Sequence, residues 1–304
     1  MKLISIQEAY QRKFKRQKAI KKLIYDASGH CAHIGKLSPG CYHCFVPDLS
    51  SRNFYSGNKC NLNCTYCNSD KNQGSNLTAK EHLATKASLF KQQALSNNFR
   101  PTAMSFSGGG EPLLYLDVIS SYMKVLRDIE RRSGHKPWYY LYTNGILADS
   151  KVLAQLKKIG FDEIRFHLGA SNFSKVVYNN LKKAVHYLKV VTVETPAWQL
   201  HRKKLFAMLP LIEDIGVKHL NIGEIELNKY NYERISKIMP HGEIYQCYET
   251  HLYDGGLVYD IIEEVIRKKY SYSVLDCNCF VKSIQRSPAK RTRHEDVPGL
   301  CAKY

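Results

Sequence analysis

The chain has 304 residues, enough for two average domains or one large α/β domain. Hydrophobic residues make up 44% and charged residues 24%, and no run reaches the roughly 18 apolar residues of a membrane-spanning helix. These values exclude a membrane-embedded protein and favour a soluble globular one. The N-terminus lacks the apolar core and cleavage site of a secretory signal, so we expect a cytoplasmic protein.

The charge is strongly basic, with 45 Lys and Arg against 27 Asp and Glu, which gives a net charge of +18. Such an excess attracts polyanions, either RNA or an acidic polypeptide, but names neither. The basic run at 12–22 predicts the solvated face of an amphipathic helix, with Ile20, Leu23 and Ile24 on the other face. A second basic run lies at 290–294.

Strand and helix patterns alternate through the middle of the chain. The predicted strands are 52–60, 102–108, 138–143, 162–169, 189–196 and 218–227. The predicted helices between them are 78–98, 114–133, 149–159, 174–188 and 199–215, and a further helix is predicted at 257–270.

Six strands joined by helical crossovers predict an α/β fold with a parallel sheet and helices on its outer face. The sheet curves into a partial barrel or winds as an open sheet, and we expect a partial (β/α)6 barrel. In both arrangements the site lies at the carboxyl ends of the strands. The expected domains are an N-terminal basic extension (1–51), the barrel (52–227) and a C-terminal segment (228–304).

Three cysteines gather just after the first predicted strand, in "CNLNCTYC" at 60–67: Cys60, Cys64 and Cys67. Thiolates at spacings of four and three can bind one face of an iron–sulfur cube, whose fourth iron then has no protein ligand. A structural zinc site is the alternative. It takes four ligands, usually in CxxC pairs, and the residues that follow are poor partners for thiolates: Asn68, Ser69 and Asp70.

This CxxxCxxC pattern, with the aromatic Tyr66 before its last cysteine, resembles the radical S-adenosylmethionine superfamily. In that family, S-adenosylmethionine chelates the open iron, the reduced cluster cleaves it, and the 5′-deoxyadenosyl radical abstracts hydrogen from a substrate. The resemblance implies a radical S-adenosylmethionine enzyme. Its cofactors would be a 4Fe–4S cluster on Cys60, Cys64 and Cys67 and S-adenosylmethionine, with flavodoxin or ferredoxin as electron donor.

A second stretch, "SFSGGGEPLL" at 105–114, is similar to the family's GGEP turn, which meets the methionine amino group. Glycines let backbone approach a ligand closely, and Glu111 offers a carboxylate to an ammonium group. "YTNG" at 142–145 also resembles a strand-end pattern of the family, although Asn-Gly is an ordinary turn signal. The ligand contacts implied here are Gly109, Gly110, Glu111, Thr143 and Asn144, beside Tyr66.

Polar residues near the ends of the later strands are weaker candidates. Ser171 and Asn172 fall where the family contacts ribose or carboxylate, Glu194 lies on the fifth strand, and Asn221 lies near the family's adenine-contact region. An ordinary strand-end polar residue is the alternative for each. The groups that could transfer a proton or quench a radical are unranked, so the catalytic residue is unknown: His167, Glu194, Glu224 and Tyr142.

The remaining cysteines include two close pairs, Cys41 with Cys44 before the barrel and Cys277 with Cys279 after it. The ends of a barrel can meet, so the pairs predict four ligands for one auxiliary iron–sulfur cluster, with Cys31 or Cys301 as substitutes. Peptide-modifying members of the resembling family often carry such clusters. A zinc site from the same pairs and unligated thiols are the alternatives, and we interpret Cys247 as a buried small residue.

The substrate is open among three hypotheses. The first is a ribosomally made peptide or protein that is crosslinked, epimerised, or cleaved and spliced in its backbone, with an acidic leader and a separate leader-recognition protein. The second is RNA modification, which the positive charge favours. The third is a non-catalytic iron–sulfur electron carrier, against which the glycine–glutamate turn argues.

Overall fold

The computed structural model describes residues 1–25, 31–44, 51–69, 101–107, 109–247, 249–278 and 280. The predicted helix at 78–98, the basic run at 290–294, Gly108, Asp70, Cys279 and Cys301 lie outside these residues. Among the described residues, no helix is long and apolar enough to cross a membrane.

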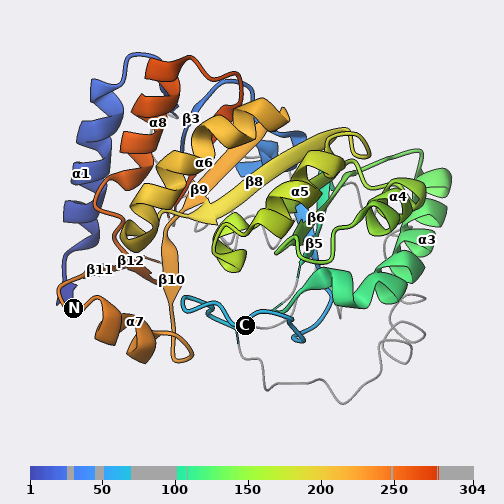
Figure 1. Cartoon of the computed structure of the whole chain (residues 1–304), viewed down its shortest axis with the longest axis horizontal. Coiled ribbons are helices and arrows are strands. Elements are labelled where there is room, and N and C mark those ends of the chain that lie inside the picture. Colours follow the sequence, from blue (N-terminus) through green and yellow to red (C-terminus); the bar gives the residue numbers. More distant parts are fainter. Residues whose placement is uncertain are drawn as a thin grey trace.

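A nine-stranded sheet forms the centre of the described chain, in the order β2-β3-β13-β9-β8-β7-β6-β5-β4 (Figure 1). Strands β4 to β9 run parallel, and each pairs with the next along the chain. The predicted α/β fold with six parallel strands is confirmed. These strands are β4 (Ser51–Tyr55), β5 (Ala103–Ser107), β6 (Trp138–Thr143), β7 (Glu163–Phe166), β8 (Val190–Pro196) and β9 (His219–Gly223).

Helices connect the parallel strands and cover the outer face of the sheet (Figure 1). Their apolar positions are spaced for one helix face, and residues such as Ile119, Leu153 and Leu205 are fully buried in the main core with the strands. The helices are α3 (Leu116–Ser133), α4 (Ser150–Ile159), α5 (Lys175–Ala184) and α6 (Arg202–Ile215), with 3-10 turns at Pro112–Tyr115, Leu168–Ser171 and Gln199–His201.

The helix ends follow local sequence signals. The Asp149 carboxylate accepts a hydrogen bond from the Val152 amide and so starts α4 one residue after the predicted beginning. Gly134 and Gly160 end α3 and α4 in left-handed backbone, which costs glycine no Cβ clash. Strand β7 ends earlier than predicted because His167 Nδ1 accepts the Ala170 amide and begins a 3-10 turn.

Both terminal segments add strands to the same sheet. Strand β13 (Ser273–Cys277) pairs parallel with β9, and β3 (Ala32–Ile34) pairs antiparallel with β13. Strand β2 (Ile24–Tyr25) pairs with β3 and ends the sheet. These strands were not predicted, because runs of two to five residues carry too little periodicity. They bring residues 31–34 and 273–277 into the same sheet as the parallel strands.

A second, four-stranded sheet has the order β1-β11-β12-β10. The single strand predicted at 218–227 is wrong in one respect: it breaks at Glu224, so that β9 stays in the large sheet and β10 joins the small one. The elements here are β1 (Lys2–Leu3), β10 (Ile225–Leu227), β11 (Glu243–Gln246), β12 (Thr250–Leu252), α1 (Ile6–Ala19), α7 (Tyr232–Ile238) and α8 (Leu257–Lys268).

Helix α1 lies beside α8 (Figure 1), and the expected solvated basic face is partly wrong. Lys13 is only 2% exposed, and its Nζ lies 3.1 Å from Glu224 and 3.5 Å from Asp254. A buried lysine is tolerable only beside carboxylates, and these come from more than 200 positions away. Ile24, expected on the apolar face, is 55% exposed because α1 ends at Ala19.

Candidate active site

The cysteine loop follows β4 and lies at the carboxyl ends of the parallel strands, as the fold predicts. Cys60, Cys64 and Cys67 are all half-buried. The Cys67 amide donates to the Cys64 carbonyl at 3.1 Å, which closes a tight turn. The loop therefore holds three thiols close to the surface of one structured turn.

The glycine turn after β5 is joined to the residues that precede Cys60. The Gly110 amide donates to the Gly57 carbonyl at 3.0 Å, and the Glu111 amide donates to the Lys59 carbonyl at 2.8 Å. A Cβ on Gly110 would lie 1.9 Å from the Lys59 carbonyl oxygen, so position 110 accepts only glycine. Two loops that the motifs singled out separately thus form one unit.

Glu111 braces this unit against the end of β6. Its carboxylate is buried and accepts hydrogen bonds from Thr143 Oγ1 at 2.6 Å, the Asn144 amide at 2.7 Å and the Leu113 amide at 3.0 Å. Burial raises the pKa of Glu111 above its ordinary value, although the three donors oppose that shift. A carboxylate can accept about four hydrogen bonds, and three of these positions on Glu111 are occupied. One position is left for a ligand ammonium group, and that contact stays a prediction.

Asn144 connects β6 to the cysteine loop itself. Its Nδ2 donates to Asn61 Oδ1 at 2.7 Å and lies 3.9 Å from Cys60 Sγ, while its Oδ1 accepts the Ile146 amide at 3.1 Å. The predicted site residues Glu111, Thr143 and Asn144 are therefore brought together beside the first cysteine.

An aromatic wall lies on the other side of the loop. The Tyr66 ring stacks on His167 with centroids 5.7 Å apart and meets Trp198 edge-on at 5.3 Å. Burial lowers the pKa of His167 to about 4, so the imidazole is neutral at ordinary pH. The Ala170 carbonyl, in the turn that His167 begins, lies 3.5 Å from Cys64 Sγ.

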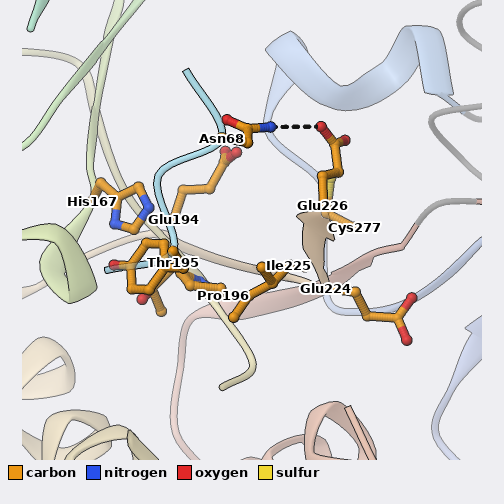
Figure 2. Close-up of a pocket in the computed structure, with 11 residues that line it drawn as sticks. Asn68, His167, Glu194, Thr195, Pro196, Glu224, Ile225, Glu226 and Cys277 are labelled. Carbon is orange, nitrogen blue, oxygen red and sulfur yellow. Dashed lines mark hydrogen bonds between the residues drawn. The ribbon is translucent and has the colours of Figure 1, made fainter. Parts of the chain in front are cut away.

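A pocket opens between this wall and the ends of β8 and β9 (Figure 2). The buried hydroxyls of Tyr66 and Thr195 have no hydrogen-bond partner among the described residues. Both face Gly169, where a Cβ would lie 2.6 Å from Thr195 Oγ1 and 2.7 Å from Tyr66 OH. The pocket is lined by Tyr66, Asn68, His167, Glu194, Thr195, Pro196, Gly223, Glu224, Ile225, Glu226 and Cys277.

The carboxylates around the pocket point in different directions (Figure 2). Glu226 accepts a 3.2 Å hydrogen bond from Asn68 Nδ2 of the cysteine loop. Glu224 turns away from the other labelled side chains and pairs with Lys13. Burial raises the pKa of Glu224 to about 7 against the opposing charge of Lys13.

The inner face of the sheet carries a buried polar network centred on Arg165. Its guanidinium donates to Glu163 at 2.8 Å, to the Tyr142 hydroxyl at 3.2 Å and to Glu194 at 3.4 Å. Burial raises the pKa of Tyr142 well above its ordinary value, so this phenol stays protonated. Asn221 Nδ2 donates to Glu194 at 3.2 Å. Tyr142, Glu194 and Asn221 therefore share one network.

Ser171 and Asn172 lie apart from this pocket. Ser171 Oγ donates to the Leu168 carbonyl at 3.1 Å within the 3-10 turn, and Asn172 Oδ1 accepts from Lys204 Nζ at 2.5 Å on the surface. Neither residue lines the pocket. Their predicted ligand contact stays a prediction.

The other cysteines partly converge. Cys31 and Cys41 are buried in one small cluster, and Cys277 packs against it while also lining the pocket. Cys41 Sγ lies 3.3 Å from Arg165 and 3.6 Å from Asn221, and burial raises its pKa. The side chain of Cys44 and all of Cys279 and Cys301 lie outside the described residues.

Within the described ranges, no three His, Cys, Asp or Glu side chains converge closely enough to hold a metal ion. A single ion needs every thiolate at about 2.3 Å from one point, whereas a cluster takes each thiolate on a different iron. Three soft donors on one loop suit a 4Fe–4S cluster, and the Gly110 contact and the two partnerless hydroxyls suit a polar ligand beside it. The residues present therefore fit a 4Fe–4S cluster and a polar ligand bound beside it.

Several residues of the site were not predicted from the sequence. Thr195, Trp198 and Glu226 line or border the pocket, and Arg234 contacts the cysteine loop from α7. Thr195 follows Glu194 on a predicted strand, so its position near a strand end was the only available signal. Nothing local marks Glu226 or Arg234, because their role depends on the break at Glu224.

Known proteins resemble this chain in sequence and in fold. The profile described as "Radical SAM superfamily" matches residues 54–191. An uncharacterized protein of Methanocaldococcus jannaschii is 28% identical over 201 residues, which are 66% of this chain and 59% of that protein.

Two groups of solved structures share the fold. Streptococcus suis SuiB bound to its precursor peptide SuiA superposes with a TM-score of 0.52 and 10% identity, over 77% of this chain and 50% of that one. Native anSMEcpe with bound AdoMet and Kp18Cys peptide gives 0.51 and 17%, over 74% of this chain and 63% of that one. The chain thus spans only about half to two thirds of the length of these proteins, and at such identities the likeness shows the fold alone.

Proposed function

We propose that this chain, whose residues 54–191 match the radical SAM profile, is an enzyme of that superfamily and abstracts hydrogen from a ribosomally made peptide or protein. The observation that carries the proposal is the joining of three strand ends around Cys60: the cysteine loop after β4, the glycine turn after β5 and Asn144 after β6. The motifs alone predicted each part. The hydrogen bonds between them support one ligand site.

In this proposal, the thiolates of Cys60, Cys64 and Cys67 hold a 4Fe–4S cluster. With S-adenosylmethionine on its open iron, that cluster supplies reductive cleavage to a 5′-deoxyadenosyl radical. Asn144 orients the first cysteine by its contact at 3.9 Å with Cys60 Sγ. Gly110 keeps the turn close to the loop, so that its backbone groups can face the methionine part of the ligand.

The pocket beside Tyr66 would take the rest of the ligand and the reacting part of the substrate. The hydroxyls of Tyr66 and Thr195 are available donors, and the neutral His167 ring adds an aromatic face that leaves no extra charge there. Glu194 is held by Arg165 and Asn221 and stays at the pocket as a fixed carboxylate. The group that moves a proton stays open among Tyr142, His167, Glu194 and Glu224.

A peptide substrate is supported by two lines of argument. SuiB and anSMEcpe, which share the fold, were crystallised with peptides, and the charge of +18 suits an acidic leader. The reaction would be crosslinking, epimerisation, or backbone cleavage and splicing. We further propose a separate leader-recognition protein and a flavodoxin or ferredoxin as electron donor.

An auxiliary iron–sulfur cluster is part of the proposal. Cys31 and Cys41 belong to one small hydrophobic cluster, and Cys277 packs against it. We therefore propose Cys31 as the substitute for one ligand in the predicted set of Cys41, Cys44, Cys277 and Cys279. Because Cys277 also lines the pocket, such a cluster would lie beside the substrate.

RNA modification is the second candidate, and one surface favours it. Helices α4 and α5 contain no Asp or Glu but carry six exposed lysines: Lys151, Lys157, Lys158, Lys175, Lys182 and Lys183. Lysines without acidic neighbours can follow a phosphate backbone.

Transfer of deuterium from the substrate to 5′-deoxyadenosine separates the two candidates. Full-length protein, reconstituted and reduced without oxygen, is incubated with perdeuterated synthetic versions of short peptides encoded beside the gene, or with perdeuterated total RNA. The proposal expects deuterium from a peptide in 5′-deoxyadenosine. Deuterium transferred from RNA, with none from peptide, would replace the first candidate with the second.

A further inference from the structure

Four successive carbonyl groups of the cysteine loop are held by side chains from a distant segment. Asn228 Nδ2 donates to the Asn68 carbonyl at 2.7 Å, and Asn231 Nδ2 donates to the Tyr66 carbonyl at 3.0 Å. Arg234 donates to the Thr65 carbonyl at 3.2 Å through Nε and to the Cys67 carbonyl at 3.1 Å through its NH2 group. In Figure 1 the loop, in cyan, lies beside β10 and α7.

The donors are themselves fixed in place. Asn231 is fully buried, its Oδ1 accepts the Asn228 amide at 2.9 Å, and its Nδ2 also donates to the Glu226 carbonyl at 2.8 Å. Asn228 Oδ1 accepts the Tyr230 amide at 2.9 Å. The turn between β10 and α7 is thus built around two asparagines whose remaining N–H groups donate to the cysteine loop. Arg234 lies about one helical turn after Asn231, in α7, and adds two more donors.

We propose that Asn228, Asn231 and Arg234 are positioning residues that hold the cysteine loop in its cluster-binding shape before any cluster is present, and that the Arg234 charge makes the bound cluster easier to reduce. The second half rests on the proposed function. The first half does not, because it concerns only hydrogen bonds between residues of this chain.

The electrostatic reason is direct. Reduction adds one negative charge to a cluster that already carries thiolates, and a nearby guanidinium stabilises that charge. Arg234 contacts the backbone of the ligand residue Cys67, and it is exposed, so added salt screens the effect. Neutralising Arg234 should therefore move the midpoint potential to a more negative value, and more so at low salt.

The loop half of the proposal is tested on the metal-free chain by hydrogen exchange. Arg234→Gln is compared with wild type and with Lys237→Gln. The second change removes a charge from the same helix, from an exposed lysine that pairs with Glu233 of its own helix. We expect faster exchange across residues 60–69, including the Cys67 amide, in Arg234→Gln only. Equal exchange in all three proteins would overturn the proposal that Arg234 holds the cysteine loop in shape.

The charge half is tested on reconstituted full-length protein by a redox titration followed by electron paramagnetic resonance. We expect a more negative midpoint potential in Arg234→Gln, a value near wild type in Arg234→Lys, and no change in Lys237→Gln. An unshifted Arg234→Gln, or an equal shift in Arg234→Lys, would overturn the role of the charge. If the wild-type protein binds no cluster, the proposed function is wrong. The hydrogen-exchange experiment then still decides whether Arg234 holds the cysteine loop in shape.

Discussion

Thr143 Oγ1, at the end of β6, donates a 2.6 Å hydrogen bond to Glu111 Oε1 in the glycine turn after β5. The same hydroxyl oxygen accepts the Gly145 amide at 3.0 Å. One side chain therefore fixes the positions of two neighbouring strand ends, and three groups depend on it: a buried carboxylate, a turn and, through Asn144, the cysteine loop.

Thr143→Val tests this brace. The change removes a donor to a buried carboxylate and leaves the Gly145 amide without its acceptor, so we expect the free energy of unfolding to fall by about 1 to 3 kcal/mol. Urea denaturation measures it. Thr250→Val, which removes an exposed hydroxyl bonded to Gln246, is the matched control and should change stability by less than about 0.5 kcal/mol. Equal effects of the two changes would argue against the brace.

Gly110→Ala tests the joining of the glycine turn to the cysteine loop. The added methyl group would meet the Lys59 carbonyl, so the two loops must move apart, at a cost of about 1 to 3 kcal/mol and with loss of cluster binding. Iron content and thermal unfolding measure both effects. Gly134→Ala meets no atom within 4 Å and should lower stability without changing iron content. Normal iron content in Gly110→Ala would contradict the arrangement.

Glu224 predicts the direction of a pH effect on stability. Its pKa is about 7 in the fold and lower in the unfolded chain, because burial disfavours the charged form, so the folded state binds more protons between about pH 4.5 and 7. The free energy of unfolding should therefore fall as pH rises through this window. In Glu224→Gln this component should be absent, whereas Glu233→Gln on the surface should keep it. A rise in stability over the same window that depends on Glu224 would refute the assignment.

Cys277→Ser tests the auxiliary cluster. If Cys277 is a ligand, iron per chain should fall while the signal of the cluster on Cys60, Cys64 and Cys67 persists, since the two sites use different thiols. Iron analysis and electron paramagnetic resonance measure this. Cys247→Ser changes a half-buried thiol in a separate hydrophobic cluster and should keep all iron. Unchanged iron in Cys277→Ser would remove the auxiliary ligand from the account.

Much of the centre of the fold could be predicted because its signals are local. The strands β4 to β9 are short apolar runs between amphipathic helices, and caps such as Asp149 fix where the helices begin. The break at Glu224 could not be predicted, since the alternation of residues continues through it. Glu224 pairs with Lys13 of α1, a contact that forms only in the folded chain.

The site, too, has residues that could be predicted from local motifs and residues that could not. Cys60, Cys64, Cys67 and the turn at Gly110 follow from motif spacing, and the structure adds the contacts that join them. The residues that hold the loop from outside, Asn231 and Arg234, carry no motif. Their function comes from a tertiary contact more than 160 positions away, which no local pattern encodes.

Formation of 5′-deoxyadenosine tests the central claim most directly. Wild-type protein and Cys64→Ala are reconstituted with iron and sulfide without oxygen, reduced with dithionite and incubated with S-adenosylmethionine. We expect the wild type to form 5′-deoxyadenosine and the variant to lose at least about 100-fold of the rate, because loss of a ligand costs more than loss of its supporting contacts. A wild type that forms none, or a Cys64→Ala protein as active as wild type, would contradict the account.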